Sequence, residues 1–203
     1  TKIKATADFI VSTGPWTHQE RWEEQSGYSP STIAAEIAGL VAAAEFAKLN
    51  GDTASAATYL AAADRWQQRV DDWTFTTAGP FGDGQYYVRI NPATKSNAGV
   101  GPQVYNPTFG PNTNANIQDK NGGGARDQKR VIDGGFLELV RMGVKRANDP
   151  KILATIPEYD LLLKQTIPGK GDAWFRYNYD GYGEDNTGAN FNGTGRGRLW
   201  PIF

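Results

Sequence analysis

Residues 14–40, GPWTHQERWEEQSGYSPSTIAAEIAGL, join a polar loop to the start of an amphipathic helix. Ser29 is predicted as the N-cap and Pro30 as the first helical residue, because a hydroxyl acceptor followed by proline is typical of a helix start. Apolar residues then recur with helical spacing at Ile33, Ile37, Leu40, Val41 and Ala44. The pattern predicts a helix over residues 30–49 that follows directly on a loop with two adjacent glutamates.

A second helix is predicted to fold back on the first. Asn50 and Gly51 end the first helix, and Asp52 or Thr53 caps the next, which runs to about Trp73. Its buried stripe consists of Tyr59, Ala63, Trp66, Val70 and Trp73. Alanine-rich faces on both helices permit close approach, so we expect antiparallel neighbours joined by a short turn.

The rest of the chain alternates between helical and irregular patterns. A short amphipathic helix is expected at the N-terminus, with Ile3, Ala7 and Ile10 on its apolar face. Residues 85–91 alternate as a short strand, and residues 92–127 are dense in Asn, Gly and Pro. We expect this long segment to be a structured excursion carrying a small hairpin, with a linker between two domains as the alternative.

Two further helices are predicted in the C-terminal half. One spans about 131–147, and another begins at Asp149-Pro150 and is ended or kinked by Pro157 before residues 159–165 resume it. From Pro168 onward the chain consists mainly of Gly, Asn, Asp and aromatic residues. The aromatic residues argue against a free linker, so a binding loop is expected there.

The composition excludes several classes of function. With 39% hydrophobic and 21% charged residues, the 203-residue chain is typical of a globular protein. A net charge of −1 and the lack of a basic run argue against nucleic acid, and no apolar run of about 20 residues predicts a membrane span. No cysteine and a single histidine, His18, argue against disulfides and a zinc site. A neutral substrate is therefore expected.

Glu23 and Glu24 lie among Trp16, Trp22 and Tyr28. A neighbouring carboxylate and an apolar ring both favour the protonated form of a carboxyl group. Aromatic faces offer stacking surfaces for sugar rings. The combination is typical of glycoside cleavage, which needs one carboxylic acid to protonate the leaving oxygen and a second carboxylate. An exposed acidic turn beside buried tryptophans is the commoner alternative.

Three stretches together carry a family resemblance. They are QERWEEQSGYSPSTIAAEIAGL at 19–40, RVIDGGFLELVRMGVKRANDP at 130–150, and WFRYNYDGYGE at 174–184 followed by GRGRLWP at 195–201. In this order they resemble glycoside hydrolase family 15, the bacterial glucoamylases and glucodextranases. The resemblance covers nearly the whole chain and is weak only between residues 92 and 127. It implies an all-α fold that is part of an (α/α)6 barrel, a toroid of paired helices, with long loops and a small β-hairpin excursion.

The resemblance also implies roles for individual residues. Glu23 corresponds to the general acid, and Glu24 is expected to bind sugar hydroxyls, with an ion pair to Arg21 or another base as the alternative. Arg176 resembles the arginine that binds sugar hydroxyls at the bottom of the family's pocket; stacking on Trp174 or pairing with Asp180 is the structural alternative. Stacking surfaces are expected from Trp16, Trp22, Tyr28 and Trp200, although a core position fits each of them singly.

The chain also departs from the family pattern. The catalytic base of the family is a glutamate beyond the GRLWP segment, hence beyond Phe203. Residues 1–203 are therefore expected to be an incomplete catalytic domain that lacks its N-terminal helices and its C-terminal part. Its expected partners are an α-glucan or oligosaccharide and the remaining parts of the same domain, and the full-length protein is expected to be secreted or periplasmic.

The resulting prediction is a fragment of an inverting, exo-acting α-glucoside hydrolase that releases glucose from non-reducing ends. A trehalase on the same scaffold and a non-catalytic sugar-binding or structural fragment are the alternatives. No cofactor or metal is predicted. Residues 180–188, DGYGEDNTG, carry oxygen ligands suited to calcium, but their spacing does not match a helix-loop-helix calcium motif.

Overall fold

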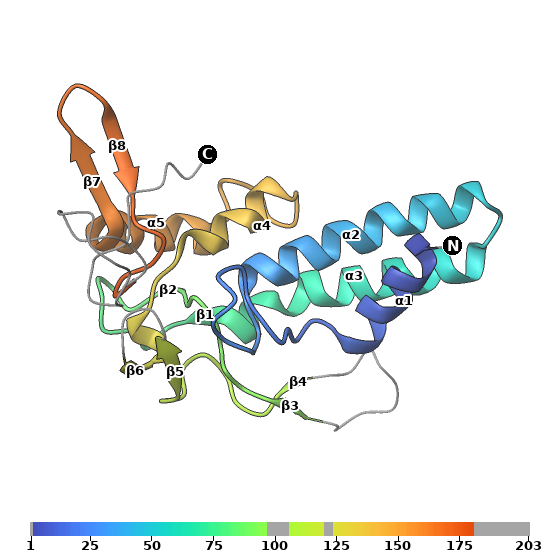
Figure 1. Cartoon of the computed structure of the whole chain (residues 1–203), viewed down its shortest axis with the longest axis horizontal. Helices are drawn as coiled ribbons and strands as arrows, with labels where there is room; N and C mark the ends of the chain where they lie inside the picture. Colours follow the sequence, from blue (N-terminus) through green and yellow to red (C-terminus); the bar gives the residue numbers. More distant parts are fainter. Residues whose placement is uncertain (1, 97–105, 120–123, 181–203) are drawn as a thin grey trace, which may run out of the picture.

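The computed structural model describes residues 2–96, 106–119 and 124–180. Its two longest helices, α2 (Pro30–Leu49) and α3 (Thr53–Thr74), form an antiparallel hairpin and lie side by side (Figure 1). The carboxylate of Asp52 caps α3 by accepting from the Ser55 amide at 3.0 Å. The predicted helical hairpin and its Asp52 cap are therefore confirmed.

The facing sides of the hairpin contain the predicted apolar stripes. The stripe of α3 is buried throughout, and on α2 Ile33, Ile37, Leu40 and Ala44 are buried. Val41 is 42% exposed, so its assignment to the buried face of α2 is wrong. It follows Leu40 directly, about 100° further around the helix, which turns its side chain away from α3.

The N-terminal helix α1 (Lys2–Thr13) packs on this hairpin. Its buried residues Ala7 and Val11 face the core, whereas Ile3 is exposed. Tyr59 on α3 donates its hydroxyl proton to Asp8 on α1 at 2.7 Å. The predicted N-terminal helix is therefore confirmed, with Ala7 and the partly buried Ile10 on its core face as predicted, joined by Val11, and with Ile3 outside it.

The described residues also form four antiparallel strand pairs. They are β1 (Phe75–Thr76) with β2 (Tyr86–Tyr87), β3 (Lys95–Ser96) with β4 (Asn106–Pro107), β5 (Asn116–Asp119) with β6 (Gly124–Asp127), and β7 (Lys164–Ile167) with β8 (Gly171–Trp174). The pairs β3–β4 and β5–β6 belong to the long excursion after residue 91, so its described residues, 92–96, 106–119 and 124–127, carry strand pairs as predicted. The hairpin β7–β8 projects from the end of α5 (Figure 1) and was not predicted.

The predicted helix over 131–147 is much shorter in the structure. Residues 131–133 are extended, because the Ile132 amide donates to Asn178 Oδ1 at 2.7 Å and the Val131 carbonyl accepts from the Arg89 amide at 3.0 Å. The 3-10 turn η1 (Gln128–Arg130) precedes these extended residues, and helix begins after them with the 3-10 turn η2 (Gly134–Leu137) and continues as α4 (Glu138–Arg141). It ends before Gly143, whose φ of 74° is incompatible with helix continuation.

Pro157 does not end the following helix. Helix α5 (Pro150–Leu163) runs through it without interruption. Buried residues on both sides of the proline, Ile152 before it and Tyr159 and Leu163 after it, keep the helix on the core. Packing therefore outweighs the roughly 3 kcal/mol that an internal proline costs.

No helix in the described ranges is both long and apolar enough to cross a membrane.

A buried carboxyl group on α2 makes stability depend on pH. Glu36 Oε2 is buried and has no hydrogen-bond partner within the described chain. Burial raises the pKa of Glu36 to about 8, and the charge of Lys95 opposes this only in part. The unfolded chain ionises this group near its ordinary value of 4.5. Above pH 4.5 the folded state retains a proton that the unfolded state releases. The free energy of unfolding therefore falls as the pH rises from 4.5 through about 8.

We expect Glu36→Gln to remove most of this loss, because glutamine stays neutral at every pH. Between pH 5 and pH 8 the wild type should lose roughly 3 kcal/mol in free energy of unfolding that the variant keeps. Urea denaturation at both pH values measures this loss. Glu45→Gln, an exposed carboxylate on the same helix, is the matched control and should lose as much as the wild type. A wild-type pH dependence in the Glu36 variant would contradict the assignment.

Candidate active site

The loop that carries the glutamate pair is closed at its base by backbone pairing. The amide of Thr17 donates to the Gly27 carbonyl at 2.8 Å and the Gly27 amide to the Thr17 carbonyl at 2.9 Å. One residue further, Tyr28 pairs with Asn91 in the same antiparallel manner. These pairs fix the two ends of the loop between α1 and α2, so that residues 20–25 form its tip.

The side chain and carbonyl of Glu20 organise this tip. Its Oε2 accepts from the Trp22 amide at 2.8 Å, its carbonyl from the Glu23 amide at 2.8 Å, and its Oε1 from the Glu24 amide at 3.3 Å. Three successive amides thus share one residue as acceptor. Glu20 itself is buried.

Glu23 lies at the exposed apex of the tip. Its φ of 62° falls in the left-handed region, which is uncommon for a residue other than glycine. Such a backbone costs on the order of 1–3 kcal/mol and persists only where the surroundings hold it. The bond from its amide to Glu20 supplies part of that hold, and the side chain projects from the loop while both neighbouring side chains turn inward.

Glu24, in contrast, is buried in a charged cluster beneath the loop. Arg89 Nη2 donates to Glu20 Oε1 at 2.6 Å and to Glu24 Oε2 at 2.7 Å. The Tyr177 hydroxyl lies 2.8 Å from both oxygens of Glu24. Burial raises the pKa of Glu24, although Arg89 and Tyr177 oppose the shift. Burial alone would lower the pKa of Arg89, but the two carboxylates reverse the sign and raise it.

Trp22 connects this cluster to the WFRYN segment. Its indole N–H donates to Asp133, which caps η2, and the guanidinium carbon of Arg176 lies 4.8 Å from its ring centroid. Asp180 accepts from Arg176 Nε and Nη2, each at 2.6 Å. Arg176 is therefore a bidentate ion-pair partner next to the indole that precedes Glu23.

The remaining predicted stacking residues are dispersed. Trp16 is half-buried, and its indole N–H donates to the Ala93 carbonyl at 3.1 Å. Tyr28 is fully buried and packs on Trp73 in the core, with 5.7 Å between ring centroids. Tyr28 therefore occupies a core position and not a stacking surface. Trp200, and residues 181–188 of the suggested calcium stretch, lie outside the described residues.

For Glu24 and Arg176 the structure shows the contacts that the alternatives named. The base that pairs with Glu24 is Arg89, whereas Arg21 approaches Glu138 at 4.0 Å. Arg176 pairs with Asp180, as the structural alternative proposed. Arg176 lies over the Trp22 ring, and Glu24 accepts from Tyr177, the residue that follows Arg176.

Four residues of the site were missed from the sequence: Glu20, Arg89, Asp133 and Tyr177. A signal existed for Arg89, since it is the single charged residue in the apolar run YYVRI. The apolar neighbours indicate a buried strand, and a cation that is buried with them needs a carboxylate partner. No comparable signal distinguishes Glu20 from the other acidic residues of the loop.

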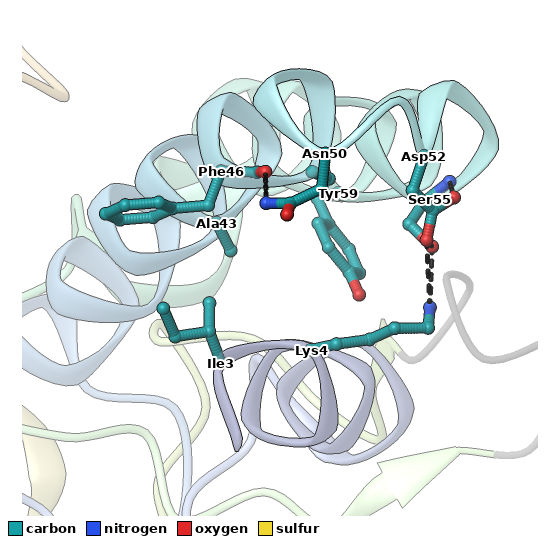
Figure 2. A pocket seen from close by; sticks show the side chains of 9 residues that line it. Ile3, Lys4, Ala43, Phe46, Asn50, Asp52, Ser55 and Tyr59 are labelled. Atoms are coloured by element: carbon teal, nitrogen blue, oxygen red, sulfur yellow. Dashed lines mark hydrogen bonds and ion pairs between the residues drawn. The ribbon is translucent and has the colours of Figure 1, made fainter. Parts of the chain in front are cut away.

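A pocket elsewhere in the molecule has a different lining. A cavity of about 330 Å³ lies between α1 and the α2–α3 turn, bordered by Ile3, Phe46 and Tyr59, with Lys4 reaching Ser55 (Figure 2). It sits at the C-terminal end of α2, whereas the glutamate loop joins its N-terminal end. Since a 20-residue helix is about 30 Å long, this pocket is remote from Glu23. Within the described ranges no group of three or more acidic or histidine side chains is placed to hold a metal.

The comparisons with known proteins agree with this architecture. A crystal structure of a bacterial glucoamylase complexed with acarbose matches 98% of the chain with a TM-score of 0.84 and 49% identity. The match confirms the predicted fold class, part of the (α/α)6 barrel of a glycoside hydrolase with small strand pairs.

The sequence comparisons identify the family. The profile of Glycosyl hydrolases family 15 matches residues 1–196. The chain is 49% identical over 201 residues to a glucoamylase of Clostridium sp. (strain G0005), which covers 99% of this chain. The chain therefore belongs to glycoside hydrolase family 15, and the predicted resemblance is confirmed. The chain spans 26% of the length of that relative and 27% of the matched crystal chain.

Gly27 provides a test of the loop closure. A Cβ at Gly27, where φ is 148°, would lie 2.2 Å from the Asn91 carbonyl oxygen. We expect Gly27→Ala to separate the two paired segments and to lower the free energy of unfolding by about 2 kcal/mol or more, because backbone atoms cannot yield cheaply. Urea denaturation measures the loss.

Gly39→Ala is the matched control. A Cβ at this helical position meets nothing within 4 Å, so the substitution should stabilise the protein by about 0.5–1 kcal/mol. Equal effects of the two substitutions would contradict the proposed steric role of Gly27.

Proposed function

We propose that the full-length protein containing this chain is an exo-acting α-glucoside hydrolase of the glucoamylase type, with Glu23 as its general acid. The observation that carries the proposal is the position of Glu23. It is the exposed apex of a loop whose neighbours on both sides, Trp22 and Glu24, are tied into a buried hydrogen-bond network. Membership of family 15 and the 49% identity to a glucoamylase support it.

The chemistry follows from what a single carboxyl group can do. The Glu23 carboxyl donates its proton to the glycosidic oxygen as the bond from that oxygen to the anomeric carbon breaks. A water molecule attacks the anomeric carbon from the opposite face and gives its proton to a second carboxylate. Attack from this face inverts the configuration of the anomeric carbon. We place this second carboxylate on a glutamate beyond Phe203. The two carboxyl groups must then be about 6.5–9.5 Å apart, because the water lies between them.

Sugar recognition is assigned to the surroundings of Glu23. Arg176 presents a planar guanidinium suited to neighbouring hydroxyl groups, and Asp180 fixes its orientation through two bonds. The Trp22 ring lies beside it, 4.8 Å from the guanidinium carbon. An oligosaccharide is the substrate class that the acarbose complex of the matched structure supports.

Glu23→Gln tests the assignment of the acid. Glutamine has nearly the same shape but cannot donate the carboxyl proton, so kcat on maltose should fall by about 10²–10⁴-fold. The Kd for acarbose should stay within about threefold, since the loop contacts that hold the backbone are retained. Glu45→Gln, on the exposed face of α2, should leave both quantities unchanged. Unchanged turnover in the Glu23 variant would falsify the assignment.

The linkage preference is a separate prediction. Both matched relatives are named as glucoamylases, which favours α-linked glucose chains over trehalose. We expect the full-length protein to release glucose from maltose at least about tenfold more efficiently, in kcat/KM, than from trehalose. Isomaltose in the same assay reports on activity at the α-1,6 linkage. A higher kcat/KM for trehalose than for maltose would contradict the glucoamylase assignment and favour the trehalase alternative.

A further inference from the structure

Arg89 is buried beneath the loop that presents Glu23. Its side chain is 1% exposed and lies two residues after β2, which ends at Tyr87. Its backbone amide donates to the Val131 carbonyl at 3.0 Å, so its Cα is fixed from below. The guanidinium carbon lies 4.1 Å from the centroid of the Tyr177 ring. The backbone of Arg89 is therefore held by the extended segment at Val131, and its guanidinium lies on the Tyr177 ring.

Among the described residues, the hydrogen bonds of the Arg89 side chain leave from one nitrogen. Nη2 donates to Glu20 and to Glu24, whereas Nε and Nη1 are buried without a hydrogen-bond partner in the described part of the chain. Nη2 is thus the atom that joins the two carboxylates of the loop.

The consequence reaches Glu23 through Glu20. A buried carboxylate without a cation is unstable, so the orientation of the Glu20 side chain depends on Arg89. The Glu20 carboxylate in turn accepts from the amides of Trp22 and Glu24, the two residues that flank Glu23, and the Glu23 amide donates to the Glu20 backbone carbonyl. These bonds hold the left-handed backbone of Glu23, and the backbone determines where its carboxyl group points.

We propose that Arg89 is a positioning residue for the general acid: through Glu20 it fixes the backbone of the loop tip, and so aims the Glu23 carboxyl at the glycosidic oxygen. This inference rests on the proposed role of Glu23. It assigns to Arg89 no contact with the substrate. Its largest effect falls on the step in which the proton is transferred to the leaving group.

Arg89→Lys tests the proposal in the full-length protein. Lysine keeps the positive charge between two carboxylates but is shorter and offers a point donor, so the charge balance survives while the Glu20 contact moves. Since a displacement of about 1 Å at a catalytic group costs about 10²-fold in rate, kcat on maltose should fall by about that factor. KM for maltose should change by less than about threefold, because sugar contacts remain.

A second substrate separates positioning from general damage. α-Glucosyl fluoride carries a leaving group that departs with little help from a proton donor. If Arg89 acts by aiming the acid, its Lys variant should hydrolyse the fluoride at nearly the wild-type rate, within about threefold. Equal losses on maltose and on the fluoride would overturn the proposal, because they would indicate a general distortion of the site.

Two further variants complete the test. Glu20→Gln removes the charge that Arg89 orients and should show the same selective loss on maltose, which keeps the test decisive if Arg89→Lys does not fold. Arg69→Lys, in an exposed ion pair with Asp72 on α3, is the matched control and should leave both rates unchanged. A Glu20 variant with wild-type activity on maltose would overturn the proposal.

The two proposals fail in different ways. If Glu23→Gln retains turnover of maltose, the assignment of the acid is wrong and the inference about Arg89 falls with it. If Glu23→Gln loses maltose but keeps the fluoride, while Arg89→Lys loses both equally, the acid assignment stands and only the role of Arg89 is rejected.

Discussion

The site depends on one buried electrostatic interaction, the guanidinium of Arg89 between the carboxylates of Glu20 and Glu24, at 2.6 and 2.7 Å. The cluster joins three segments that are far apart in the sequence: the loop with Glu20 and Glu24, the segment with Arg89, and the C-terminal part with Tyr177. Removing one member of such a buried pair typically costs about 3–5 kcal/mol, because the other charge is left without compensation. The loop tip can hold an unfavourable backbone at Glu23 because this cluster beneath it is rigid.

A small second core surrounds the cluster. Ile90, Ile117, Val131 and Tyr177 pack together and are separate from the main core of α2, α3 and α5, with Trp22 resting on them. The low dielectric of this environment strengthens the ion pairs and excludes water from them. The helical hairpin forms the support, whereas Glu20, Glu23 and Glu24 lie on a loop. Functional residues are often found on loops that a scaffold of regular elements holds in place.

Sequence reasoning worked best where one periodic pattern acts locally. The hairpin of α2 and α3, the Asp52 cap and the N-terminal helix follow from spacing and capping alone. It failed where distant contacts decide. Residues 131–133 are extended because Asn178 and Arg89 bind their backbone, and α5 continues through Pro157 because buried residues on both sides hold it. Neither contact is visible in a local window of sequence.

The sequence by itself determined the helix pairing, the family and the position of the glutamate pair, because these depend on short-range spacing and on residues that are adjacent in the chain. Only the tertiary structure decided that the two glutamates differ, with Glu23 exposed and Glu24 buried. It also decided that Tyr28 belongs to the core and that Arg89, 65 residues from Glu24, balances its charge. Adjacent residues have the same local sequence around them, and only long-range packing gives them different surroundings.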